Sequence, residues 1–288
     1  MLFYDLMWYN YPEDKEYFKI NPELEENIKY KPIKNKELSK DISEYENFIK
    51  KYHFLYNKIP FVKNIFVSNS VSFKSVHKNS DLDLLIISKK NRLFLARFFT
   101  WIIFKIFWIW WKHEKWKFCI WFWIDEQAQD LYPISIYPID LYLAYWIAHL
   151  QPIYSTQKWD ELEIFKENSW VKQIIPNYRY KNKKIINIDC KYWESFIKKV
   201  FEKVFNFDFI ENILRLVQTK KMKEKKKQLW KWWDSIIISK YMLKFFSPDI
   251  RKIVYLKYKS LKPHTNSIKI LKNWKIKNKY HKEEEKII

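Results

Sequence analysis

Residues Phe66–Ile87 read FVSNSVSFKSVHKNSDLDLLII and contain two β-strand patterns separated by a polar stretch. Residues 64–71 are rich in β-branched and aromatic side chains, and residues 81–88 are mostly aliphatic. Such short runs, bounded by Asn, Ser and Lys, are typical of buried strands. The polar residues 76–79 predict the turn before the second strand. The stretch therefore predicts two strands joined by a short polar connection.

Helical and strand patterns alternate on both sides of this stretch. Residues 45–62 carry apolar side chains at helical spacing, residues 92–107 predict a second helix, and residues 118–124 predict a third strand. This alternation indicates an α/β core, and the patterns that follow are mainly helical. We therefore divide the chain into an N-terminal helical or irregular segment, a core, a helical C-terminal region and a charged tail, at residues 1–44, 45–137, 138–274 and 275–288.

Asp81 and Asp83 lie two residues apart on the second predicted strand. Because side chains alternate between the faces of a strand, both carboxylates point to the same face. Neighbouring carboxylates raise each other's pKa and are costly on an apolar strand unless a cation neutralises them. Mg²⁺ prefers carboxylate oxygens and keeps open positions for phosphate, so the pair indicates a magnesium site. A plainer interpretation puts Asp81 at the strand end as a turn acceptor, with only Asp83 on the sheet.

The residues before this pair extend the pattern. Ser68-Asn69-Ser70 end the first strand, and residues 71–80 separate them from Asp81. This arrangement resembles the signature of the DNA polymerase beta-like nucleotidyltransferase superfamily. In that superfamily a strand ends in Gly-Ser or Gly-Gly, a short helical turn follows, and the next strand carries Asp-x-Asp. Here Asn69 stands where the glycine is expected, and asparagine is the next residue most tolerant of positive φ.

Later segments are similar to bacterial nucleotidyltransferase-domain proteins, so that the resemblance covers residues 50–260. They include FCIWFWIDE, DLYLAYWIAHLQPIY, ENSWVKQIIPN and IIISKYMLKFFSPDIRKIVYLKY. The resemblance implies an α+β fold with a small mixed β-sheet core flanked by helices. It also implies an enzyme that transfers a nucleoside monophosphate from a nucleoside triphosphate to an acceptor. The acceptor stays open between a small molecule, an RNA end and a protein hydroxyl.

The resemblance also implies roles for individual residues. Mg²⁺, with Mn²⁺ as the alternative, would be held by Asp81 and Asp83. A third carboxylate is expected on the strand after the helix, where the only acidic residues are Asp125 and Glu126. Contacts to the nucleotide are expected from Ser68, Asn69, Ser70, Arg92 and Arg97. For the two arginines the plainer interpretation is a solvated helix start for Arg92 and a pair with a helix carboxylate for Arg97.

A second class of function is a catalytically degraded module that binds nucleotide, RNA or another polyanion. Asn69 and the uncertain third carboxylate favour it, and the formal net charge of +21 is compatible with it. However, only five of the 54 basic residues are arginine, the residue that specific nucleic-acid readers use most. A third interpretation is a peripheral membrane protein that uses the aromatic residues 93–111. Arg97 and Lys105 interrupt that run, so no stable membrane insertion is expected.

The chain contains two cysteines without metal-ligand spacing, and its N-terminus lacks the pattern of a secretory signal, which together predict a cytoplasmic protein. It also contains 16 tryptophans and no glycine, although glycine normally supplies about 7% of a protein. Tryptophan-rich runs at 108–111 and 230–233 fall in turn-like segments, where glycine is the expected residue. We predict that most tryptophans are glycines encoded by UGA in a bacterial lineage that reassigns this codon. Trp170 is the exception, because the resemblance expects tryptophan there.

Overall fold

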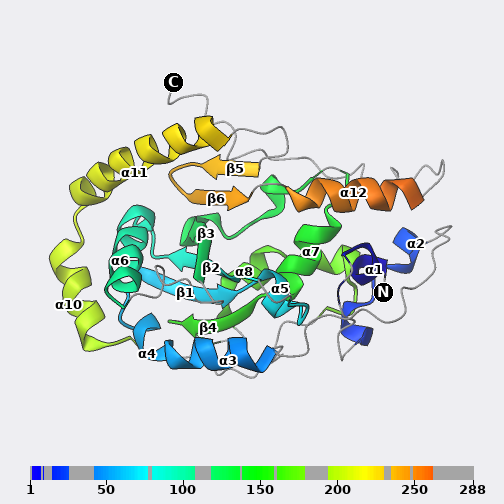
Figure 1. Cartoon of the computed structure of the whole chain (residues 1–288), viewed down its shortest axis with the longest axis horizontal. Helices are drawn as coiled ribbons and strands as arrows, with labels where there is room; N and C mark the ends of the chain where they lie inside the picture. The colour runs from blue at the N-terminus through cyan, green and yellow to red at the C-terminus, as the bar shows by residue number, and fades with distance from the viewer. Residues whose placement is uncertain are drawn as a thin grey trace.

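The computed structural model describes residues 2–7, 9, 15–25, 42–76, 80–107, 118–136, 138–158, 161–178, 194–229, 235–246 and 249–261. A six-stranded mixed sheet with the order β4-β1-β2-β3-β6-β5 forms its centre (Figure 1). Helices cover both faces of this sheet. The predicted α+β fold is confirmed.

The middle of the sheet is made of the three strands that the sequence predicts. β1 (Val62–Val67) pairs antiparallel with β2 (Leu82–Ser88), and β2 pairs parallel with β3 (Phe118–Asp125). The short helix α5 (Asn69–Ser72) follows β1. The connection from β2 to β3 contains α6 (Leu93–Ile106), because parallel neighbours need a crossover rather than a tight hairpin.

Both edges of these three strands are completed by the C-terminal half of the chain. β4 (Gln151–Ser155) pairs antiparallel with β1, and β6 (Met242–Phe246) pairs antiparallel with β3. β5 (Ser235–Ile238) then pairs antiparallel with β6. This half of the chain was expected to be mainly helical, and these three strands correct that expectation.

The other described helices surround the sheet and follow the apolar spacing of their sequences. They are α1 (Leu2–Met7), α2 (Pro22–Glu25), α3 (Ile42–Lys51), α4 (His53–Tyr56), α7 (Leu141–Ala148), α8 (Glu163–Glu167), α9 (Val171–Ile174), α10 (Phe196–Phe205), α11 (Asp208–Leu229) and α12 (Ile250–Leu261). Short 3₁₀ turns lie at Lys15–Phe18, Glu126–Ala128 and Tyr132–Ile134. None of the helices in the described ranges is both long enough and apolar enough to cross a bilayer.

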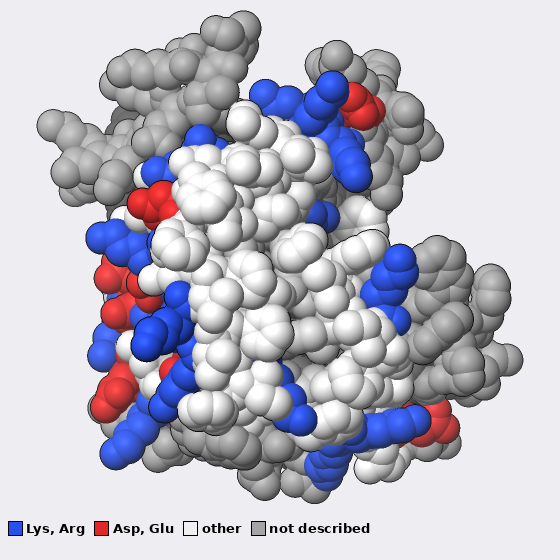
Figure 2. All heavy atoms as spheres, turned by 90° about the vertical axis from the view of Figure 1, so that its left-hand side faces the viewer, with Lys and Arg blue, Asp and Glu red and all other residues white. Residues whose placement is uncertain are grey.

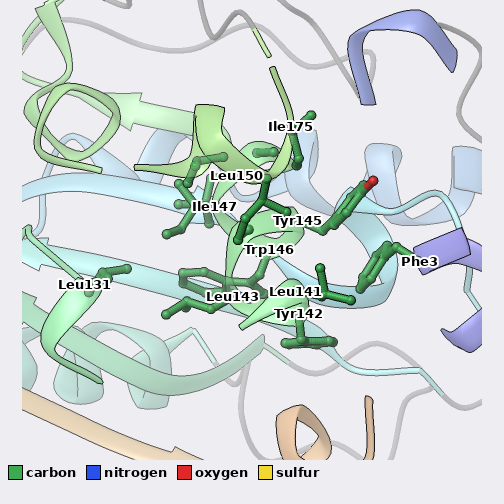
Figure 3. Close-up of a cluster of buried hydrophobic side chains, with 14 of the residues drawn as sticks. Phe3, Leu131, Leu141, Tyr142, Leu143, Tyr145, Trp146, Ile147, Leu150 and Ile175 are labelled. Atoms are coloured by element: carbon green, nitrogen blue, oxygen red, sulfur yellow. The ribbon is translucent and has the colours of Figure 1, made fainter. Parts of the chain in front are cut away.

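The two faces of the sheet bury two separate apolar cores. Alternate residues of β2 divide between them: Leu85 belongs to the core under α1, α7 and α12, and Leu84 to the core under α6 and α11. In the first core Phe3 stacks on Tyr145 of α7, with ring centroids 4.0 Å apart. Figure 3 shows these rings together with Trp146 and other side chains of α7. Asp83 has the same parity as Leu85, so it faces this first core.

Five tryptophans fall within the described ranges: Trp101, Trp121, Trp123, Trp146 and Trp170. Trp170 is buried and donates its indole N–H to Asn168 at 3.0 Å. Trp123 and Trp146 are also buried. Among described residues, positive φ occurs at Phe61, Asn69, Lys74 and Asn91, and at no tryptophan. The runs at 108–111 and 230–233 and the tail at 275–288 lie outside the described residues, so recoding stays a hypothesis.

Candidate functional site

The turn after β1 brings Asn69 against Asp83. Ser68 is extended, and Asn69 then takes φ of 54°, in the left-handed region where glycine is usual. The Asn69 amide Nδ2 donates to Asp83 Oδ2 at 2.8 Å, and its Oδ1 accepts from the Tyr142 hydroxyl at 3.0 Å. The turn thus uses the tolerance of asparagine for positive φ.

The two serines of the motif, Ser68 and Ser70, have different surroundings. Ser68 is buried, and both its backbone N–H and its hydroxyl donate to the Asp83 carbonyl, at 2.9 and 3.3 Å. Ser68 therefore fastens the end of β1 to the start of β2. Ser70 instead lines a cavity next to Asp83. Of the two, Ser70 is the one placed to meet a ligand.

The cost of burying the Asp83 carboxylate is only partly offset by the hydrogen bonds that it accepts. Burial raises its pKa from the ordinary 3.8 to about 6, against the hydrogen bonds from Asn69 and Cys119, while the charge of Asp81 raises it further. Asp81 is exposed and precedes the first residue of β2, as in the plainer interpretation. It is still close enough to act on Asp83. A divalent cation between the two would remove both the repulsion and much of the burial cost.

The cavity beside Asp83 has a volume of about 330 Å³, which is the size of a small-molecule site. Asn69, Ser70 and Asp83 form its polar end. Phe122 of β3 and residues of α7, including Tyr142, supply an apolar wall. An apolar pocket with a few convergent polar groups is the expected form of a ligand site.

Charged residues that were not predicted from the sequence lie on the other side of this cavity. Lys244 of β6 is buried, and burial together with the charge of Arg251 lowers its pKa to about 7, against the pull of Asp249 and Asp140. Arg251 binds both carboxylate oxygens of Asp249, at 2.9 and 2.8 Å. A lysine inside the apolar run Met242–Phe246 was the sequence signal, but its relation to Asp83 depends on long-range strand pairing.

The expectation that Asp125 or Glu126 faces Asp81 is wrong. In the parallel register of β2 and β3, Cys119 lies opposite Asp83, and Asp125 lies opposite Ser88. Five residues of strand correspond to roughly 16 Å, so Asp125 sits at the far end of the sheet.

Both acids have structural partners at that far end. Asp125 Oδ2 accepts from the Asn91 backbone N–H at 2.7 Å, and its Oδ1 accepts from Gln127 at 3.0 Å. Glu126 accepts from the Lys90 backbone N–H at 3.0 Å and pairs with Lys63 at 2.9 Å. They shape the connection into α6 rather than the site at Asp83.

Arg92 and Arg97 also belong to the far end, since α6 begins after the last residue of β2. Arg92 pairs with Asp208 at 2.7 Å, and its Nε donates to Asn206 at the same distance. Arg97 is partly buried and donates to the Gln218 side chain at 2.7 Å. The structure therefore does not bring either guanidinium to Asp83.

A second cavity, of about 440 Å³, lies at the far end and is bordered by Lys63, Lys89, Lys90, Arg92 and Lys203. Much of this positive charge is already neutralised. Lys63 pairs with Glu126, and Lys89 pairs with Glu202 at 2.8 Å. The cavity is thus weaker support for a polyanion site than its lining suggests.

Within the described ranges no group of three or more His, Cys, Asp and Glu side chains is arranged to hold a metal ion. Searches against protein-family models, curated proteins and solved structures found no significant match to this chain. The function is therefore inferred from the groups around Asp83.

Proposed function

We propose that the cavity beside Asp83 binds a nucleoside triphosphate, with Mg²⁺ held by Asp81 and Asp83. The protein would transfer the nucleoside monophosphate to an acceptor hydroxyl and release pyrophosphate. The observation that carries this proposal is the Asn69 turn, which brings the carboxylate of Asp83 and the hydroxyl of Ser70 to one edge of a ligand-sized cavity.

The donor set fits Mg²⁺. This ion is commonly held by one or two carboxylates, with waters and substrate phosphates as its other ligands. Asp81 and Asp83 supply two such groups, and the raised pKa of Asp83 reflects a negative charge that the fold alone does not compensate. When bound, the ion would neutralise phosphate charge near the reacting phosphorus.

Other groups on the cavity have roles in the same proposal. The Ser70 hydroxyl can donate to a phosphate oxygen, and Phe122 and Tyr142 offer apolar surface for the uncharged part of a ligand. Lys244 Nζ, with a pKa of about 7, can take a proton from an acceptor hydroxyl near neutral pH.

A second candidate is a module that binds nucleotide without transferring it. One observation favours it: the residue opposite Asp83 on β3 is Cys119, not the third carboxylate expected on that strand. A single metal site would bind a triphosphate but would lack the second ion that clamps the attacking and leaving oxygens in two-metal enzymes.

The two candidates separate in one pair of measurements. The protein is incubated with each α-labelled triphosphate, Mg²⁺ and cell extract, and label transfer is measured beside direct binding of Mg²⁺-nucleotide by calorimetry. Transfer that is lost in Asp83→Ala but kept in Asp208→Ala, an exposed acid of the far end, supports the enzyme. Binding without transfer supports the module. Full transfer by Asp83→Ala would refute the proposed site.

The recoding hypothesis bears directly on this assay. Trp146 lines the cavity, so a glycine there would enlarge it on the side of α7. Both the printed chain and a glycine-restored chain that keeps Trp170 should therefore be assayed. Reading the codons at positions 101, 121, 123 and 146 decides which chain is natural.

A further inference from the structure

α10 presents polar side chains to the sheet and most of its apolar side chains to solvent. Its fully buried residue is Lys198, whose ammonium contacts the Val62 carbonyl and donates to the Tyr154 hydroxyl at 2.8 Å. Glu202, also on the inner side, accepts from the Phe61 backbone N–H at 2.7 Å. The helix thus attaches to the sheet through polar groups, the reverse of the usual arrangement.

Phe201 and Phe205 of α10 contact Phe99 of α6, but most of the other apolar side chains of α10 face outward. Phe196 is 80% exposed, and Ile197, Val200 and Val204 are between 41% and 55% exposed. A helix with such a regular apolar stripe normally buries it. Nothing in the described residues covers this stripe.

α11 continues the same surface. Phe209, Ile213, Leu216 and Val217 recur at helical spacing and are between 48% and 68% exposed. Figure 2 shows this face of the molecule, with uncharged residues across its centre. We name the exposed apolar residues of α10 and α11, together with Phe207 between the two helices, the α10–α11 face.

The size of this face exceeds what a monomer normally exposes. At about 150–250 Å² per ring, Phe196, Phe201, Phe207 and Phe209 together leave roughly 350–600 Å² in contact with solvent. The largest apolar patch of a typical monomer is about 300–600 Å² in all, and here the aliphatic residues add to the rings. Larger patches mark interaction sites.

Lysines outnumber acidic residues around the face, although Asp208 and Glu224 of α11 are also exposed. Lys199 and Lys203 of α10 and Lys220, Lys221 and Lys223 of α11 are exposed. Figure 2 shows Lys and Arg around the uncharged centre, with acidic side chains mainly along one edge. A second copy of the chain docked face to face would bring lysines against lysines. A partner that is apolar inside and negative at its surface is complementary to both parts.

We propose that the α10–α11 face docks on the surface of a lipid bilayer that contains anionic phospholipids. The apolar side chains enter the boundary between headgroups and acyl chains, and the lysines contact lipid phosphates. This adsorption needs no membrane-spanning helix. It is also independent of the recoding hypothesis, because residues 196–217 contain no tryptophan.

The test is co-sedimentation of the full chain with vesicles of phosphatidylcholine alone or mixed with phosphatidylglycerol, at low and high salt. The wild-type protein should bind the mixed vesicles at low salt and bind neutral vesicles more weakly. The variant Phe196→Ser/Leu216→Ser should lower the partition coefficient on the order of tenfold per residue. Leu256→Ser on α12, 51% exposed and away from this face, is the matched control and should bind like wild type.

A charge variant tests the lysines separately. Lys199→Glu/Lys220→Glu should weaken binding to the mixed vesicles by at least roughly 25-fold, at about fivefold per lysine. Lys259→Glu on α12 should have little effect. All six substituted positions in these variants are exposed, so thermal unfolding should be unchanged and a loss of binding would not reflect misfolding.

Three outcomes would overturn the proposal. The wild-type chain could fail to sediment with anionic vesicles at low salt, or the Phe196→Ser/Leu216→Ser variant could bind as well as the control. Analytical ultracentrifugation could instead show a dimer that this variant abolishes without any vesicle binding, which would assign the face to self-association. None of these outcomes depends on nucleotide transfer at Asp83.

Discussion

Replacing Asp83 with asparagine should make the metal-free protein more stable at neutral pH. Asp83 is a partly buried carboxylate, and its replacement keeps the shape of the side chain while removing the charge. The new amide oxygen can still accept the hydrogen bond from Asn69 that now goes to Asp83 Oδ2. The variant therefore removes the burial cost of the charge and little else.

The size and sign of the effect follow from the pKa. A rise from 3.8 to about 6 corresponds to about 3 kcal/mol of stability. The folded protein holds the proton more tightly than the unfolded chain, so this contribution is present at low pH. It is lost as the pH rises from about 4 to about 6. Above that window the wild-type protein carries the full cost, whereas Asp83→Asn carries none.

Urea unfolding of both proteins in a chelating buffer, at about pH 4 and about pH 7.5, measures this difference. Asp83→Asn should gain about 2–3 kcal/mol over wild type at the higher pH and be nearly equal to it at the lower pH. Mg²⁺ should stabilise the wild-type protein and not the variant. Asp208→Asn, an exposed control, should change the stability by less than about 1 kcal/mol at either pH, because an exposed ion pair contributes little. A variant less stable than wild type at pH 7.5, or with the wild-type pH slope, would refute the reasoning.

Substitutions at three further positions test the Asn69 turn, the buried Lys244 and the recoding hypothesis. Asn69→Ala should cost about 2–3 kcal/mol in urea unfolding, since alanine disfavours φ of 54° and two hydrogen bonds are lost, and Asn69→Gly should cost about 1 kcal/mol less. Lys244→Met should raise stability by about 2–4 kcal/mol near pH 7 and have little effect near pH 10. The pKa of Lys244 is about 7 in the folded protein and 10.5 ordinarily, so the wild-type protein becomes less stable as the pH falls from 10.5 towards 7. An equal gain by Lys244→Met at both pH values would contradict this. Trp123→Gly should cost about 4 kcal/mol or more, because the ring is fully buried, and unchanged thermal stability would instead favour glycine as the natural residue there.

The strands and the carboxylate pair could be predicted from sequence because they depend on local patterns. Apolar runs located β1, β2 and β3, and period-two alternation placed Asp83 on a defined face. The positive φ at Asn69 followed from the steric tolerance of asparagine. None of these predictions required knowledge of which strands pair.

The position of the third acid needed the direction of β3. A 14-residue helix between β2 and β3 makes the pair parallel, and a parallel pair puts Asp125 at the end of the sheet away from Asp83. The length of the helix predicted at residues 92–107 was the sequence signal for this direction. Local sequence patterns could not assign Lys244 and Arg251 to the cavity, because the pairing of β6 with β3 brings them there from a distant part of the chain.

The pairing of β6 with β3 also sets the order in which this protein can fold during synthesis. When β1, β2 and β3 have left the ribosome, the strands that cover their outer edges, β4 and β6, do not yet exist. At about 5–20 residues per second, the stretch between β3 and β6 takes several seconds to translate. Throughout that interval the edge of β3 is open to pairing with other chains. We therefore expect nascent chains to need a chaperone until β6 emerges, and truncations before residue 242 to aggregate.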